Sequence, residues 1–262
     1  ALNVGPERRI RRWGRGESMA RAREDLDSDL DRYFVAFKHN LNGPIPEAVR
    51  SADRLLLNLA SHLDDPPNLT TARMFQVAFG SWRAAFALSM AGSASQVPIL
   101  LRHALESALY GCLFANDKEW EEVWWLRETD NSAKSRFRNG AMAALWETLD
   151  RVDPNLVKRL RGTLDFLISF GAHPNVFQLV SATGVRHQSD DRSTIDTALL
   201  GDNEMRDATH RLLLGAAIDI ASVVERTWML RFSAVGGREM IDECIGQMRL
   251  FSNVLEYSDS SE

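Results

Sequence analysis

The alternation of apolar and polar positions predicts helices over most of the chain. Amphipathic helices are predicted over residues 17–40, 45–63, 141–150, 154–172, 203–234 and 237–254. Two further segments, 69–92 and 95–115, are apolar on almost every side, which is typical of helices buried at the centre of a bundle. The pattern therefore predicts an all-α protein, a multi-helix bundle with these two segments at its centre.

The segment near residues 176–200 departs from the helical pattern. β-branched and alternating residues lie on both sides of the polar stretch "RHQSDDRS". Such a pattern is typical of two strands joined by a turn. We therefore expect a small β-hairpin or extended insertion near 176–200.

The chain shows no internal repeat and no linker rich in proline, glycine or serine, so we expect one helical domain over residues 19–255. Residues 256–262, "EYSDSSE", are predicted to form a disordered tail. Residues 1–18 are basic and lack the apolar core of a secretory signal. They are either a flexible basic arm or a non-native leader that precedes a natural start at Met19.

Composition narrows the possible functions. The 262 residues are 45% hydrophobic, enough for a sizeable core, and their formal charge of −5 disfavours a general polyanion binder. The basic N-terminal segment is thus the one feature of the sequence that favours nucleic acid as a partner. Cys112 and Cys244 suggest neither a disulfide framework nor a zinc site, which favours the cytoplasm. The longest apolar stretch contains Arg83 and is too short for a membrane span.

Charged residues interrupt the most apolar helices. They are Arg83, Arg102, Glu106, Arg161, Asp165 and Asp219. Ionised side chains are rarely buried unless they are paired, so we expect these groups to meet one another. Arg102 and Glu106 are four residues apart and share a helix face, and Arg161 and Asp165 repeat that spacing. The sequence therefore predicts a polar seam between central helices, which His173 could join from the end of its helix.

The predicted seam has two interpretations. In the functional interpretation, the seam lines a pocket that binds an anionic ligand, and Glu106 or His173 acts there as acid or base. The ligand-binding residues would be Arg83, Arg102, Arg161, Asp165 and Asp219. In the structural one it is an ion network that fixes helix register, which we favour because such networks are common.

No cofactor or metal is expected from the motifs. The histidines show no HExxH pattern, and the chain contains no G-x-S-x-G, P-loop or G-x-G-x-x-G sequence. Trp120 and Trp124 in "EWEEVWW" share one face of a short helix, and the residues after Arg127 are predicted to form a loop or a short helix. We interpret the tryptophan pair as core or a dimer seam, with stacking on bases or sugars as the alternative.

Three features lie close together over roughly residues 95–200: the Arg-x-x-x-Glu of 102–106, the helix ending in "FGAHPN", and the extended segment behind it. Together they resemble uncharacterised bacterial helical proteins related to the HEPN group. The resemblance implies a helical bundle, often dimeric, of a kind found in defence systems, many of whose members resemble metal-independent RNases. Their catalytic signature is an arginine followed after four to six residues by a histidine. Here Arg32 and His39 fit that spacing without the polar residue that commonly follows the arginine, so the resemblance implies the scaffold rather than the nuclease.

Two functional hypotheses follow. The leading one is a noncatalytic interaction or regulatory module that acts as a homodimer or through a protein partner, because the apolar and tryptophan-rich helix faces exceed the needs of one core. The alternative is an enzyme, either a HEPN-like metal-independent RNase or a hydrolase of an anionic small molecule. That enzyme would use Arg102, Glu106 and His173 around one pocket.

Overall fold

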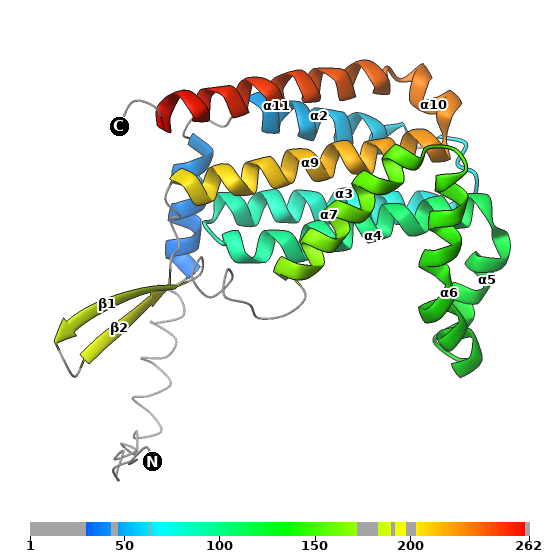
Figure 1. Ribbon diagram of the computed structural model, residues 1–262, viewed down its shortest axis with the longest axis horizontal. Helices are drawn as coiled ribbons and strands as arrows, with labels where there is room; N and C mark the ends of the chain where they lie inside the picture. The colour runs from blue at the N-terminus through cyan, green and yellow to red at the C-terminus, as the bar shows by residue number, and fades with distance from the viewer. Residues whose placement is uncertain are drawn as a thin grey trace, which may run out of the picture.

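The structure is a computed structural model that describes residues 30–42, 47–62, 64–171, 183–189, 192–197 and 203–259. Its helices are α2 (Glu47–Ser61), α3 (Leu69–Met90), α4 (Val97–Asn116), α5 (Lys118–Leu126), α6 (Asn131–Asp150), α7 (Pro154–Gly171), α9 (Asn203–Thr227), α10 (Met229–Ala234) and α11 (Gly237–Asp259). A helix over residues 30–42 and a 3-10 turn, η1 (Ala94–Gln96), complete them. The predicted all-α bundle is thereby confirmed (Figure 1).

Helix α4 is the centre of the bundle. It packs against α3, α5, α6, α7 and α9. Its core side chains are fully buried, with Leu101, Leu105 and Leu109 each 0% exposed. This agrees with the prediction from a segment that is apolar on almost every side. None of the helices that the structure describes combines the length and apolar content needed to cross a bilayer.

Helix α3 is less buried than its sequence predicts. One face, which includes Phe75 and Trp82, is buried against α4, α2 and α9. Leu69 and Val77 lie on the rest of the helix and are 61% and 44% exposed. The prediction of a fully central helix is therefore wrong for α3, because its neighbours cover it from one side and leave apolar surface uncovered.

Helices α5 and α6 stand across one end of α3 and α4 (Figure 1). The Asp117 carboxylate starts α5 by accepting the backbone N–H groups of Glu119 and Trp120. Asp130 starts α6 in the same way, by accepting the N–H of Ser132. Because of this cap, α6 begins at Asn131, and the predicted shorter helix over 141–150 is corrected.

The C-terminal part also differs from its predicted boundaries. The helix predicted over 203–234 is broken at Trp228, whose φ of −146° and ψ of 48° are not helical. The break lets Phe232 of α10 enter the core, where it is 2% exposed. Helix α11 (Gly237–Asp259) runs beyond its predicted end at residue 254, and residues 260–262 of the predicted tail lie outside the described residues. The sequence from 247 onward contains no glycine or proline, and polarity alone does not end a helix.

Close packing at the corner between α10 and α11 gives a testable prediction. Gly237 lies against the Phe232 ring, and a Cβ at this position would come within 2.7 Å of two ring atoms. We expect Gly237→Ala to lower the free energy of unfolding by about 1–2 kcal/mol, because the buried ring must shift. Gly246→Ala on the same helix meets no atom within 4 Å and should be neutral or stabilising. Urea denaturation compares the two variants, and equal stabilities would contradict the close contact.

A two-stranded antiparallel pair lies outside the bundle. Strands β1 (Thr183–Ser189) and β2 (Arg192–Thr197) pair in a register that places Val185 opposite Ile195. The predicted insertion near 176–200 also includes residues outside the described ranges. The extent of the insertion therefore stays a prediction.

Candidate functional site

The predicted polar seam does not form one centre among the described residues. Arg83 donates from Nε and Nη2 to the Asp53 carboxylate, at 2.9 Å each, and its side chain is 47% exposed. Arg161 and Asp165 are exposed on α7, and the Arg161 guanidinium lies 5.3 Å from the Trp146 ring centre. The expectation that these charges share one centre is wrong, because they lie on outward faces of α3 and α7. His173 lies outside the described residues.

Asp219 is buried in a separate cluster. Its side chain is 4% exposed and accepts hydrogen bonds from Arg159 Nε and Thr163 Oγ1, each at 2.7 Å. Burial raises the pKa of Asp219, and the Thr163 hydrogen bond and the Arg159 charge offset part of that effect. Arg159 and Thr163 are not among the site residues predicted from the sequence. Their spacing of four residues along one edge of α7 was the available signal.

Arg102 and Glu106 form the predicted pair. Arg102 Nε donates to Glu106 Oε1 at 2.9 Å, and the two side chains are 34% and 27% exposed. This local pairing is confirmed, and it leaves Glu106 half-buried at the surface of α4. The pair thus fixes a carboxylate at the side of the helix that faces α3 and α5.

Glu106 lines a cavity of about 380 Å³ between α3, α4 and the end of α5, which we call the α3–α5 groove. Its walls include Arg73, Val77, His103, Tyr110, Trp124 and Arg127. The volume lies at the lower end of the range that is typical of ligand pockets. Charged and hydrogen-bonding side chains line it beside apolar surface from Met74, Val77 and two tryptophans, a combination that binding sites use.

The aromatic wall of the groove is held by contacts in several directions. The Trp124 ring packs 5.7 Å from Phe114 and 4.8 Å from Trp125, centre to centre. Trp125 Nε1 donates to Thr70 Oγ1 at 3.3 Å, which ties α5 to α3. The Arg127 guanidinium lies 4.8 Å from the Trp124 ring centre, in a cation–π contact. The wall is therefore positioned before any ligand arrives.

The polar groups of the groove are partly committed to partners. His103 Nδ1 lies 2.9 Å from Ser81 Oγ, and Ser107 Oγ donates to the His103 carbonyl at 2.7 Å. Burial raises the pKa of Tyr110, and the nearby Glu106 charge adds to this effect, so its hydroxyl stays protonated at neutral pH. The groove can hold an apolar group beside hydrogen-bonding side chains.

Other predicted chemistry finds less structural basis. Arg32 and His39 are exposed on the helix over 30–42, and neither lines the α3–α5 groove. Within the part of the chain that the structure describes, no three His, Cys, Asp or Glu residues are grouped so as to hold a metal ion. Trp124 was predicted to belong to the core or a dimer seam, and neither Arg73 nor Arg127 was predicted as a site residue. The "WWLR" sequence at the end of α5 was the signal that could have joined them.

Comparisons with models of known protein families, with curated proteins and with solved structures each gave no match. The similarity to the HEPN group therefore stays a prediction from the sequence.

Proposed function

We propose that the protein is a noncatalytic interaction module that binds a protein segment in the α3–α5 groove. The observation that carries this proposal is the solvent-exposed apolar surface of the groove. Two of its lining side chains, Trp125 and Val77, are 53% and 44% exposed. Tryptophan, tyrosine and arginine, which dominate the energetics of protein interfaces, make up much of its walls. Two buried cysteines that form no disulfide fit a reducing compartment such as the cytoplasm.

Charge at the groove favours an acidic partner segment. Arg73 and Arg127 line it, and Arg127 also donates from Nε to the exposed Glu128 carboxylate at 3.2 Å. The Glu106 carboxylate is the acidic group of the lining and is already paired with Arg102. An apolar side chain with a neighbouring aspartate or glutamate therefore matches the aromatic wall and the positive charge of Arg73.

A display library of random peptides tests the proposed occupant on the intact chain. We expect selected peptides to carry an aromatic or aliphatic anchor beside an acidic residue. Val77→Glu should weaken the binding of a selected peptide at least about tenfold, because it places a second carboxylate in the groove. Leu57→Glu is the matched control, since Leu57 on α2 is 42% exposed and does not line the groove. Equal losses in both variants, or peptides without an acidic preference, would refute the proposed occupant.

A second copy of the chain is one possible source of the segment. Phe34 and Val35 on the helix over 30–42 are 63% and 66% exposed, which is a large apolar surface for a helix facing water. Sedimentation of the wild type and of Val77→Glu distinguishes the sources. A dimer that Val77→Glu dissociates identifies a second copy, and a wild-type monomer identifies another protein.

The enzymatic alternative is favoured by one observation: His103 and Glu106 line the same groove. A hydrolase of an anionic small molecule or a metal-independent RNase would need Glu106 as acid or base and would lose turnover in Glu106→Gln. The interaction proposal instead expects no cleavage of RNA or phosphodiester substrates by the wild type. Turnover that disappears in Glu106→Gln would decide for the enzyme.

A further inference from the structure

We propose that a second pocket, between α7, α9 and α11, binds a phosphoryl group. This pocket has a volume of about 230 Å³, and we call it the arginine pocket. Arg159, Arg226 and Arg238 line it, together with Asp153, Ser222 and Glu225. It shares no lining residue with the α3–α5 groove, so this proposal does not depend on the proposed function.

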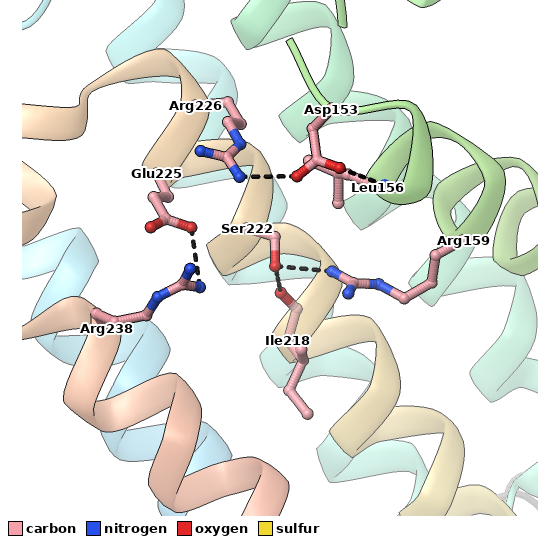
Figure 2. A network of polar contacts seen from close by, with 8 residues as sticks. All are labelled: Asp153, Leu156, Arg159, Ile218, Ser222, Glu225, Arg226 and Arg238. Atoms are coloured by element: carbon pink, nitrogen blue, oxygen red, sulfur yellow. Dashed lines mark hydrogen bonds and ion pairs between the residues drawn. The ribbon is translucent and has the colours of Figure 1, made fainter. Parts of the chain in front are cut away.

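The three arginines come from three helices and line the same pocket. Figure 2 shows Arg159 reaching Ser222 from α7, Arg238 reaching Glu225 from α11, and Arg226 of α9 reaching Asp153. Arg159 Nη2 donates to Ser222 Oγ at 2.8 Å. Convergence of guanidinium groups from separate elements is the usual arrangement of a phosphate site, because each supplies planar, charge-assisted donors.

These arginines retain donors beyond the bonds that hold them. A guanidinium carries five N–H groups. Arg226 donates from Nη2 to Asp153 at 2.7 Å, while its Nε is buried without a hydrogen-bond partner among the described residues. Arg238 donates from Nη1 to Glu225 at 3.3 Å. A buried N–H left without an acceptor is costly, and an oxyanion in the pocket would supply one.

Each of the three arginines is held by one carboxylate, so the ion pairs are balanced before a ligand binds: Arg226 pairs with Asp153, Arg238 with Glu225, and Arg159 with Asp219. An oxyanion would therefore bind to the N–H groups that these pairs leave over, with the pairs holding the guanidinium groups in place. The Arg238 side chain is 57% exposed and gives a ligand access to the pocket from solvent, while Glu225 is 13% exposed and keeps Arg238 as its partner.

Size and lining distinguish a phosphoryl group from a larger organic ligand. Leu156 is the one apolar side chain among the lining residues that the structure describes, and no aromatic ring is present there. The volume is below the range typical of pockets for drug-sized molecules. A compact oxyanion with several acceptor oxygens matches three converging donors better than a planar carboxylate does.

Titration calorimetry of the full chain with inorganic phosphate tests the site. We expect saturable binding that sulfate competes for and that chloride at equal ionic strength does not abolish. Arg238→Gln should weaken phosphate binding at least about tenfold, since hydrogen bonds to charged groups each contribute that much. Arg83→Gln is the matched control, because Arg83 is a half-exposed arginine paired with Asp53 on other helices. Its affinity should equal that of the wild type.

Two further measurements complete the test. Arg226→Lys keeps the charge but removes the buried Nε, so it should also weaken binding, and its thermal melting curve shows whether it is folded. A nucleoside monophosphate that binds more tightly than inorganic phosphate identifies a phosphoryl group on a larger ligand, and equal affinity identifies free phosphate. No saturable binding of either probe, or equal loss in Arg238→Gln and Arg83→Gln, overturns the proposal.

Discussion

Replacing Trp82 with alanine is expected to lower the free energy of unfolding by about 3–5 kcal/mol. Trp82 is 0% exposed, and its side chain fills the space between α3 and the helices that cover it. Its Nε1 donates to the Leu213 carbonyl at 2.8 Å, which joins α3 to α9 across the core. The alanine variant loses the buried apolar area, leaves a cavity and removes this interhelical bond.

Two other tryptophan variants provide reference values for the stability loss of Trp82→Ala. Trp82→Phe keeps most of the ring volume and loses the donor, so we expect a smaller cost of about 1–2 kcal/mol. Trp125→Ala removes a tryptophan that is 53% exposed, and we expect a cost of about 1 kcal/mol or less. Urea denaturation followed by circular dichroism reports all three. The packing of α3 on α9 would be disproved by a Trp82→Ala variant as stable as Trp125→Ala.

The sequence predicts most helices of the bundle because their buried residues recur at helical spacing. It also predicts the central place of α4, where the apolar positions surround the helix. The Arg102–Glu106 pair follows from the sequence as well, since both partners lie on one helix and their distance depends on local geometry. Local periodicity thus determines these features before any tertiary packing is known.

The remaining features depend on which helices become neighbours. Arg83 pairs with Asp53 of α2, and Asp219 pairs with Arg159 of α7, and neither partner is close in the sequence. The exposure of Val77 likewise depends on how much of α3 the other helices cover. For the same reason, the α3–α5 groove could not be assembled from the sequence, although Glu106 was identified as a candidate.

Helix boundaries were missed for a more local reason. Asp130 caps α6 and extends it well beyond the segment where apolar periodicity is evident. Trp228 ends α9, although its neighbours continue the apolar pattern into α10. Periodicity identifies a helix body, whereas a single capping or non-helical residue decides where that helix begins and ends.

Asp219→Ala is expected to lower the free energy of unfolding by about 2–4 kcal/mol, because it removes the acceptor of Arg159 and Thr163 in a buried site. The loss should be nearer the lower value, since Arg159 is 49% exposed and can be hydrated once its partner is gone. Asp219→Asn keeps an oxygen acceptor and the side-chain volume, so we expect about 1 kcal/mol. Urea denaturation at pH 7 measures both variants.

The pH dependence tests the electrostatic cause. Burial raises the pKa of Asp219 in the folded state, so the folded protein binds this proton more tightly than the unfolded chain does. The stability of the wild type relative to Asp219→Asn should therefore increase as pH falls from 7 through that raised pKa toward about 4, the value of an unfolded aspartate. An ion pair stronger than the burial effect would give a decrease instead.

Asp153 provides the control with the opposite sign. The backbone N–H of Leu156 and then the Arg226 side chain lower the pKa of Asp153. Its contribution is fully present above about pH 4 and is lost as pH falls through the lowered folded value. The free energy of unfolding of the wild type, compared with that of Asp153→Asn, should thus decrease in acid. Compared with that of Asp219→Asn, it should already have increased. Curves of the same sign would mean that burial does not determine the titration of Asp219.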